Sequence, residues 1–275
     1  MESYIEIEKY ILDAIDKEIF RITSNDMEKQ ASSFLGVDRK QVKLCIKKLI
    51  EKEEVVFNFE HGHTFLERSF NKPVQLSNYV VIKPSNISYQ KKNKEIVVNI
   101  EKGISFGDGR HPSTRLAIKG IEYCLVDLGM LKDKNDTSVL DIGTGSGILA
   151  IVSLLFGIKK AYGLDIDLNA IQEAKLNASN NCLYDDRIQI SNVLLESLNL
   201  RFDLILANLR YPTLYKIADK INSICLEEGF VVLSGIRDDE ANIIKDIYSR
   251  SFSIIWSEGE KGWESIVFRK VKNQE

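Results

Sequence analysis

The pattern of apolar and polar positions divides the chain into two parts that predict different structures. Over roughly the first 70 residues, apolar side chains recur at helical spacing and then change to strand-like runs. From about residue 139, short apolar runs are followed by helix-compatible stretches, which is typical of an α/β domain. The sequence therefore predicts a small helix-rich unit followed by a larger α/β unit.

The N-terminal pattern predicts three helices and a hairpin. Gly36 is suited to end the second helix, and Asp38 is suited to begin the third. The predicted helices cover residues 4–20, 24–35 and 38–50, and the predicted strands 55–59 and 64–66 flank the polar tip 60–63. This succession resembles a winged helix-turn-helix domain.

The most distinctive segment, 139–150, has the sequence V-L-D-I-G-T-G-S-G-I-L-A. It predicts a buried strand, a tight turn with glycine at 143, 145 and 147, and the first turn of a helix. Glycine has no Cβ, so a ligand can lie directly against this backbone. Eighteen residues past Gly147, a second apolar run ends in Asp165. A carboxylate at the tip of a neighbouring strand commonly binds ribose hydroxyls, which predicts a nucleoside cofactor.

The spacing of the glycines indicates which nucleoside. Dinucleotide-binding turns have the pattern G-x-G-x-x-G/A, whereas the residue three positions after Gly145 is Ile148. The pattern G-x-G-x-G resembles motif I of the class I S-adenosylmethionine-dependent methyltransferases, and segment 165–170 resembles their ribose-binding strand end. The resemblance implies a Rossmann-like, doubly wound α/β sheet with an antiparallel last strand, and S-adenosyl-L-methionine as cofactor. A purely structural glycine turn in another α/β domain is the alternative.

Composition is consistent with this interpretation and excludes other classes. The 275 residues and 44% hydrophobic content suit one large domain and one small one. The net charge of −3 gives no general affinity for polyanions. No signal-peptide pattern is present, and the longest apolar run, 148–158, is too short to span a bilayer. We expect a cytoplasmic protein without membrane contact, metal or disulfide, whose four scattered cysteines are buried thiols: Cys45, Cys124, Cys182 and Cys225.

The charge of the N-terminal unit argues against nucleic acid as its main partner. Its third predicted helix is basic, but residues 1–70 contain 11 Lys and Arg against 14 Asp and Glu. Proteins that bind a nucleic-acid groove usually present a clearly basic surface. Contact with nucleic acid is therefore less favoured than a solvated helix face, or a domain that dimerises or binds protein. His61 and His63 are interpreted as an exposed turn, since no further metal ligands lie nearby.

A second glycine-rich run, 103–114, precedes the first. Its glycines, proline and hydroxyl residues are unsuited to a strand or helix interior, and Pro112 or Ser113 is expected to begin a helix. The free N–H groups of such a helix end are able to donate hydrogen bonds to the carboxylate of the cofactor's methionine. Upstream, the runs 79–84 and 96–100 are candidate strands.

Several separated motifs across residues 79–270 resemble one family, the methyltransferases of ribosomal protein L11. The matching residues are Phe106, Gly107, Gly109, His111, Pro112 and Thr114, the run 139–150, Asp165–Asp167, 207–209, 233–236, Glu260, Trp263 and Glu264. The resemblance implies methylation of lysine ε-amines and an N-terminal α-amine on a ribosomal protein. The cofactor-binding residues predicted from motifs and resemblance are Phe106, Gly107, Thr114, Asp141, Gly143, Gly145, Asp165, Ile166 and Asn208.

The chain also departs from the family in ways that concern the methyl acceptor. Asp108 and Arg110 replace small hydroxyl residues, and Ile87 replaces a tryptophan. The family's N-terminal domain is a small α+β module, whereas residues 1–72 resemble a winged helix, with connecting strands at 73–102 and the methyltransferase domain at 103–275. Two alternatives therefore stay open: a methyltransferase of a small molecule or RNA, whose N-terminal domain dimerises or grips the substrate, and a non-catalytic cofactor-binding module. Oligomeric state is not predicted.

Asn208 is the predicted catalytic residue because it ends the apolar run 202–207 at the cofactor crevice. Its oxygens are able to orient an amine towards an activated methyl group. The following residues 209–212 do not form the N-P-P-Y motif of enzymes that methylate planar amide or adenine nitrogens. We interpret His111 as shaping its turn, and Asp141 as ordering the glycine turn or reaching the cofactor's amino group. Tyr211 and Trp263 are assigned to either the substrate mouth or the core.

Overall fold

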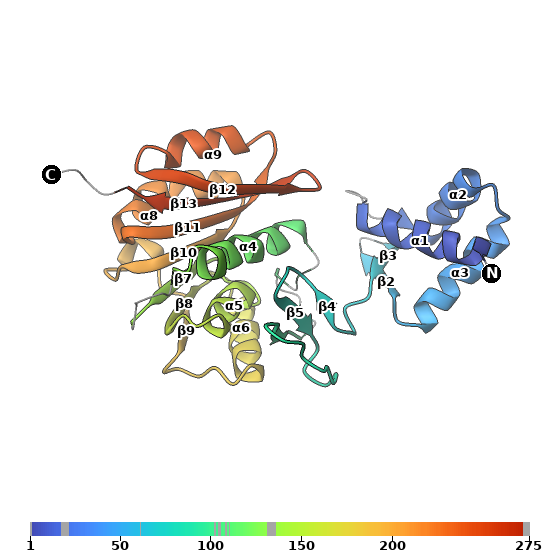
Figure 1. The fold of residues 1–275 in the computed structure, drawn as a ribbon, viewed down its shortest axis with the longest axis horizontal. Coiled ribbons are helices and arrows are strands. Elements are labelled where there is room, and N and C mark those ends of the chain that lie inside the picture. The colour runs from blue at the N-terminus through green and yellow to red at the C-terminus, as the bar shows by residue number, and fades with distance from the viewer. Residues whose placement is uncertain are drawn as a thin grey trace. The chain divides into compact units, whose positions relative to one another are not determined.

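The computed structural model describes residues 2–17, 22–60, 62–101, 103, 106–107, 109, 111–130 and 136–271. The chain divides at Lys72–Pro73 into two units, each with its own internal contacts (Figure 1). No helix among these residues is long and apolar enough to cross a membrane.

The N-terminal unit combines three helices with a three-stranded antiparallel sheet of order β1-β3-β2. Its elements are α1 (Glu2–Lys17), β1 (Ile22–Thr23), α2 (Ser24–Leu35), α3 (Arg39–Glu51), β2 (Val55–Glu60) and β3 (His63–Arg68). The three helices and the hairpin match the predicted succession. The short strand β1, which pairs with β3, was not predicted, and the expected extension of the first helix to residue 20 falls outside the described residues.

Local signals explain where the helices of this unit begin and end. The hydroxyl of Thr23 accepts the N–H of Asp26 and caps α2, and Gly36 ends α2 in the left-handed conformation at φ 66°. Asp38 forms a capping box with Gln41 at the start of α3. The helices and strands bury a separate apolar cluster whose fully buried members include Met27 and Leu49.

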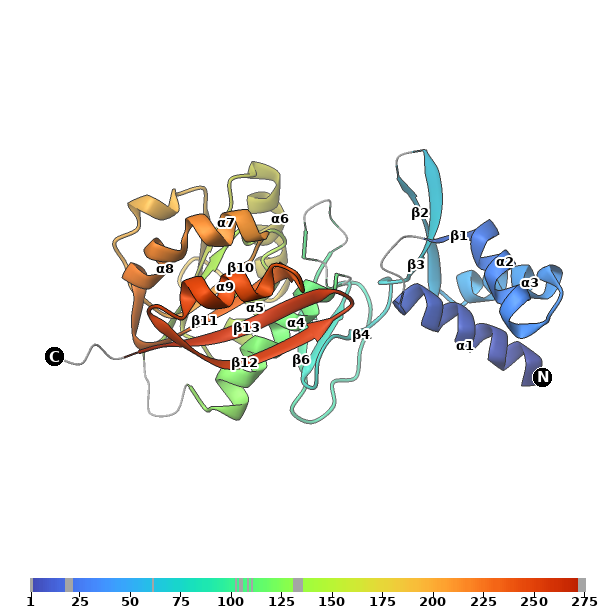
Figure 2. The same ribbon diagram turned by 90° about the horizontal axis from the view of Figure 1, so that it is seen from above.

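The larger unit is built on a seven-stranded sheet of order β12-β13-β11-β10-β7-β8-β9. Its strands are β7 (Ser138–Ile142), β8 (Lys160–Leu164), β9 (Ile188–Ser191), β10 (Phe202–Asn208), β11 (Cys225–Arg237), β12 (Phe252–Glu260) and β13 (Trp263–Lys270). The first five are mutually parallel, and β13 pairs antiparallel with both β11 and β12. This is the predicted sheet with an antiparallel last strand, and Figure 2 shows β12 and β13 as a long hairpin beside α9.

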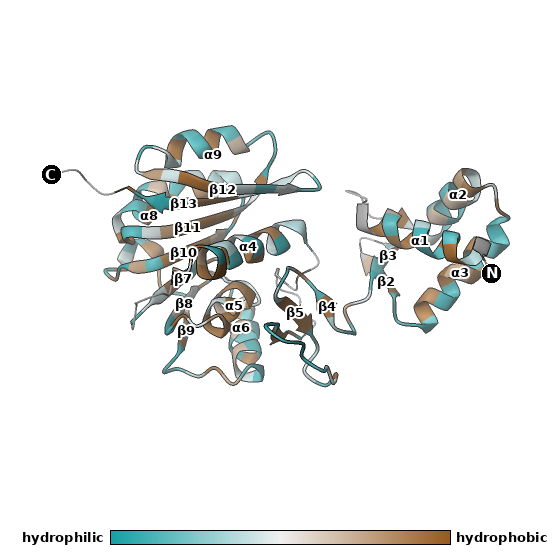
Figure 3. Ribbon diagram, in the orientation of Figure 1, coloured by the Kyte–Doolittle hydropathy of each residue, from teal (hydrophilic) through white to brown (hydrophobic). Residues whose placement is uncertain are grey.

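Helices cover both faces of this sheet because its strands are apolar on both sides. Val231 and Leu233 of β11 pack with α7 (Tyr211–Lys216), α8 (Ala218–Ile224) and α9 (Ala241–Tyr248). The intervening Val232 faces the opposite layer, where its side chain would lie 2.8 Å from a Cβ built on Gly120 of α4 (Pro112–Glu122). Figure 3 shows the resulting contrast between hydrophobic central strands and helices of mixed hydropathy.

The larger unit contains further helices, helical turns and a small second sheet. A π-helical turn (Tyr123–Asp127) extends α4, while α5 (Ile148–Leu155) follows β7 and α6 (Leu168–Asn180) follows β8. A short 3₁₀ turn (Leu195–Ser197) precedes β10. Between residues 73 and 101, a small sheet of order β4-β5-β6 consists of β4 (Val74–Gln75), β5 (Val80–Lys83) and β6 (Ile96–Asn99). The predicted runs 79–84 and 96–100 are its parallel strands.

The four cysteines are all free thiols, but one expectation about them was wrong. Cys45, Cys124 and Cys225 are buried, whereas Cys182 is exposed. Cys182 lies just after α6 with a positive φ of 57°, in a turn that closes the helix and places its side chain outside the core.

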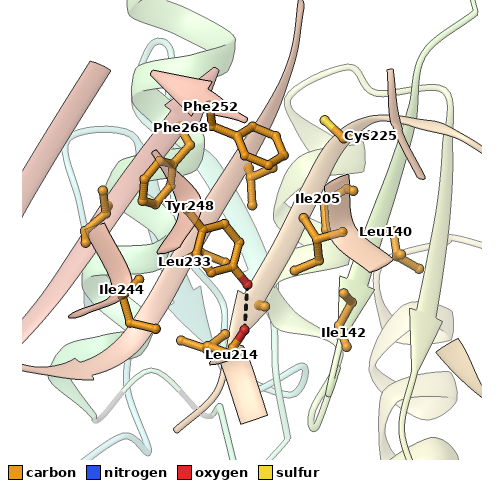
Figure 4. Packing of buried hydrophobic residues seen from close by; sticks show 14 of the residues in the cluster. Leu140, Ile142, Ile205, Leu214, Cys225, Leu233, Ile244, Tyr248, Phe252 and Phe268 are labelled. Atoms are coloured by element: carbon orange, nitrogen blue, oxygen red, sulfur yellow. Dashed lines mark hydrogen bonds between the residues drawn. The ribbon is translucent and has the colours of Figure 1, made fainter. Parts of the chain in front are cut away.

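Aromatic side chains fill the core between the sheet and α9 (Figure 4). The Tyr248 ring is 1% exposed and lies 5.3 Å from the ring of Phe268. Its hydroxyl donates a hydrogen bond of 2.8 Å to the carbonyl of Leu214 in α7. Burial raises the pKa of Tyr248, so the ring stays neutral and the hydroxyl remains a donor.

Tyr248→Phe is expected to destabilise the larger unit by about 1 kcal/mol, because it leaves the Leu214 carbonyl without its donor in the core. Both tryptophans, Trp256 and Trp263, lie in this unit, so tryptophan fluorescence during urea unfolding reports on it. Tyr215→Phe makes the same chemical change on an exposed ring and is expected to have no measurable effect. Equal stability losses in the two variants would contradict the role given to this hydrogen bond.

Candidate active site

A pocket of about 680 Å³ lies at the carboxyl ends of β7, β8 and β10. Ligands of open α/β sheets bind at this edge, where strand order reverses on either side of the first strand. The lining residues are Phe106, His111, Ser113, Ile142, Gly143, Gly145, Leu164–Asp167, Ala170, 193–196, Asn208–Arg210, Thr213, Ile217, Gly235 and Trp263. No group of three potential metal-ligating side chains occurs in the part of the chain that the structure describes.

The glycine turn is tightly packed against neighbouring backbone. Gly143, Gly145 and Gly147 all have positive φ, at 71°, 53° and 82°. A Cβ on Gly145 would lie 2.4 Å from the carbonyl oxygen of Phe106, and one on Gly147 would lie 3.1 Å from the Cβ of Ala174. The turn thus needs glycine for its own conformation and packing, in addition to the access that Gly143 and Gly145 give to the pocket.

The carboxylate of Asp165 is held in the pocket by two backbone donors. One oxygen, Oδ2, accepts the N–H of Gly145 at 2.9 Å, and the other accepts the N–H of Asp167 at 3.0 Å. Each oxygen keeps a lone pair for a ligand. The next residue, Ile166, also lines the pocket and is 92% exposed, as expected of an apolar side chain that a bound ring would cover.

Asp141 lies behind the glycine turn and does not line the pocket. Its Oδ2 accepts the hydroxyl of Thr144 at 2.7 Å and the N–H of Ala150 at 3.3 Å. Its Oδ1 is buried and has no hydrogen-bond partner among the described residues. Burial raises the pKa of Asp141 to about 7. This geometry favours the ordering of the turn over direct contact with a cofactor.

Asn208 ends β10 with its side chain at the pocket. Its Nδ2 lies 3.4 Å from the buried hydroxyl oxygen of Thr114, to which it donates, and its Oδ1 is buried with no partner among the described residues. A Cβ on Gly235 would lie 3.0 Å from this oxygen. Gly235, at φ 77°, therefore leaves room for this acceptor atom, which no other described residue uses.

The start of α4 differs from the prediction. Pro112 is the first residue of the helix, but the expected free N–H groups are engaged by His111. Nδ1 of His111 accepts the N–H of Ser113, and its carbonyl accepts the N–H groups of Thr114 and Arg115. His111 therefore caps the helix, and this helix end offers no free donor at those three positions.

Aromatic and guanidinium groups surround the mouth of the pocket. The ring of Trp263 lies 4.6 Å from the ring of His111, which in turn lies 5.1 Å from that of Phe106. The guanidinium carbon of Arg210 lies 5.1 Å from the Trp263 centroid, and Glu240 holds this guanidinium at 3.2 Å. These contacts fix the orientation of the indole ring.

The structure brings most of the predicted residues together. Phe106, Gly143, Gly145, Asp165, Ile166 and Asn208 line the pocket. The other three lie behind the lining: Thr114 contacts Asn208, the carbonyl of Gly107 accepts the hydroxyl of Ser146, and Asp141 supports the turn. Trp263 lines the pocket, whereas Tyr211 packs against the core. Asp108 and Arg110 lie outside the described residues.

Sequence reasoning missed the segment 193–196 and the residues Thr213 and Ile217, all of which line the pocket. The segment follows β9, the strand next to β8. Its position directly after a parallel strand could have predicted this, because the carboxyl ends of parallel strands meet at one edge of the sheet. No distinctive residue type marks this segment.

The strand order, the glycine turn and the acidic end of β8 define a class I methyltransferase. The family model described as ribosomal protein L11 methyltransferase (PrmA) matches residues 29–271. The chain therefore belongs to the ribosomal protein L11 methyltransferase family.

Individual relatives support this assignment. The chain is 32% identical over 232 residues to the ribosomal protein L11 methyltransferase of Fusobacterium nucleatum, covering 81% of this chain and 72% of that protein. It is 34% identical over 208 residues to that of Staphylococcus epidermidis, covering 74% and 64%. The crystal structure of ribosomal protein L11 methylase from Lactobacillus delbrueckii subsp. bulgaricus has a TM-score of 0.64 at 30% identity, covering 73% of this chain and 100% of that one.

The buried Asp141 carboxyl predicts a pH dependence of stability. Its pKa is about 7 in the folded state, against an ordinary value of 3.8 for an exposed aspartate, so the folded state holds this proton more tightly. Its contribution to stability is present below pH 4 and is lost as the pH rises through about 7. Asp141→Asn removes this titration. As the pH rises from 5 to 8, the unfolding free energy of the variant is therefore expected to increase by about 2 kcal/mol relative to that of the wild type.

Urea unfolding followed by tryptophan fluorescence at several pH values measures this difference. Asp246→Asn, on an exposed face of α9, is the control and is expected to give a difference from wild type that varies little with pH. The same flat profile in Asp141→Asn would be inconsistent with a folded-state pKa near 7.

Proposed function

We propose that the chain transfers methyl groups from S-adenosyl-L-methionine to amino groups of ribosomal protein L11, on lysine side chains or the N-terminus. Membership of the family supports the reaction and the acceptor. The observation that carries the proposal is that Asn208, whose Oδ1 has no partner among the described residues, lines the same pocket as the fixed carboxylate of Asp165.

The residues of the pocket fit the proposed cofactor. Asp165 would accept the ribose hydroxyls, and the backbone of Gly143 and Gly145 would lie against the ligand without side chains in the way. The apolar residues at 193–195 offer a surface for a purine ring, and Phe106 forms a further wall. The cofactor would supply a methyl group that is already activated on a sulfonium.

The protein's task is then mainly to orient the acceptor amine. Asn208 Oδ1 would accept an N–H of the neutral amine and turn its lone pair towards the methyl group, while the contact with Thr114 keeps the amide in place. Nδ1 of His111 accepts the N–H of Ser113 in the helix cap, so we assign His111 the role of shaping the turn. Trp263 and Phe106 would enclose the alkyl chain of the acceptor.

The N-terminal unit is proposed as a winged helix that contacts the protein substrate. Its order of three helices and three strands supports this interpretation, and its excess of acidic residues favours a protein partner over RNA. We propose that residues 103–275 perform the transfer and that 73–102 connect the two parts. The four free cysteines are consistent with a cytoplasmic location.

Asn208→Ala is expected to lower the rate of methyl transfer about 100-fold, because it removes the group that orients the amine. The assay measures tritium transfer from labelled S-adenosylmethionine to purified ribosomal protein L11. Asn242→Ala, an exposed asparagine on α9, is the matched control and is expected to retain full activity. Unchanged turnover in Asn208→Ala would remove Asn208 from the mechanism.

Asp165→Ala is expected to weaken binding of S-adenosylhomocysteine by about 10- to 100-fold, since it deletes a charge-assisted acceptor of ribose hydroxyls. Isothermal titration calorimetry measures this affinity directly, and Asp246→Ala controls for the loss of one carboxylate.

The acceptor is tested by incubating the wild-type enzyme with labelled cofactor and, in parallel reactions, with ribosomal protein L11, ribosomal RNA or a small-molecule extract. Label in RNA or in small molecules, with none in L11, would overturn the protein-substrate proposal.

A further inference from the structure

Asn177 of α6 has a fully buried side chain that bonds to two separate segments. Its Nδ2 donates to the carbonyl of Ser146 in the glycine turn at 2.9 Å, and its Oδ1 accepts the N–H of Glu101 at 3.1 Å. One amide thereby links the turn to the segment that leads towards Phe106. Both of its polar atoms are used within the protein, and it does not line the pocket.

The carbonyl of Ser146 depends on Asn177 because it lacks the usual helical donor, the N–H of the residue four positions later. That N–H belongs to Ala150 and donates to Asp141 instead. Ser146 is also bonded on its other side: its N–H donates to the carbonyl of Phe106 at 3.0 Å, and its hydroxyl donates to the carbonyl of Gly107 at 2.8 Å. Asn177 therefore completes the set of bonds that holds Phe106 against the turn.

We propose that Asn177 is a positioning residue for the cofactor site, which fixes the glycine turn and the Phe106 wall relative to each other. This inference rests on the proposed function, since it assumes that the pocket binds S-adenosylmethionine. Asn177 also lies on the helix that follows the carboxylate of Asp165, because α6 begins immediately after Asp165–Asp167, with Asp167 as its cap. A single rigid helix thus connects the carboxylate, the turn and the wall.

Asn181, one helical turn further on, provides a natural comparison. It bonds to the end of β6 through both the N–H and the carbonyl of Asn99, each at 2.8 Å, and to the carbonyl of Asn177. It thus anchors the end of α6 to the small sheet that contains β6, without contacting the glycine turn. Loss of Asn181 removes a similar number of hydrogen bonds but leaves the Ser146 carbonyl satisfied.

The test compares Asn177→Ala, the milder Asn177→Ser and the control Asn181→Ala in the full chain. Binding of S-adenosylhomocysteine is measured by calorimetry and thermal stability by tryptophan fluorescence. Both Asn177 variants are expected to raise the Kd at least about 10-fold, while Asn181→Ala changes it less than about twofold at a comparable loss of Tm. In turnover, the Asn177 variants are expected to raise KM for the cofactor more than they lower kcat.

The outcomes separate this inference from the function on which it rests. A wild type that binds S-adenosylhomocysteine, with Asn177→Ser binding equally well, would overturn the positioning role alone. Asn177 and Asn181 variants that lose affinity in proportion to Tm would also overturn it, because a general loss of stability would then explain the data. A wild type that does not bind S-adenosylhomocysteine would overturn both proposals.

Discussion

The site depends on the hydrogen bond between the N–H of Gly145 and the carboxylate of Asp165. This bond joins the ends of two adjacent parallel strands, β7 and β8, at the edge where their loops diverge. It sets the conformation of the turn and the direction of the carboxylate together, so neither needs to be ordered when a ligand arrives. Preorganisation of this kind lowers the entropic cost of binding. The Phe106 carbonyl against Gly145 and the packing of Gly147 on Ala174 leave little room for a side chain at either glycine.

A buried carboxyl group close to this bond shows the energetic cost of the arrangement. Asp141 satisfies two donors around the glycine turn but keeps one oxygen without a partner among the described residues, and burial makes its ionised form unfavourable. An apolar residue would avoid this cost but would leave the Thr144 hydroxyl and the Ala150 amide without an acceptor. The turn therefore retains a carboxyl group where a residue chosen for stability alone would be neutral.

The sequence was sufficient to predict the features that depend on local constraints. The glycines at positive φ, the cap at Asp38 and the acidic end of β8 each follow from a few neighbouring residues. Features that depend on distant pairing were less accessible. The short strand β1 forms only because β3 lies beside it, and Trp263 reaches the pocket because β13 pairs with β11. The donors at the start of α4 were expected to be free because the cap by the His111 side chain was not anticipated.

The two units have separate apolar cores, one around Met27 and Leu49 and the other around Tyr248 and Phe268. A substitution in one core is therefore not expected to require a second substitution in the other core, because the effects of distant sites on stability are approximately additive. Over evolutionary time, this independence lets the N-terminal unit diverge or be exchanged while selection on the transfer chemistry maintains the larger one. The surface of the N-terminal unit is thus able to change without any change in the pocket of the larger unit.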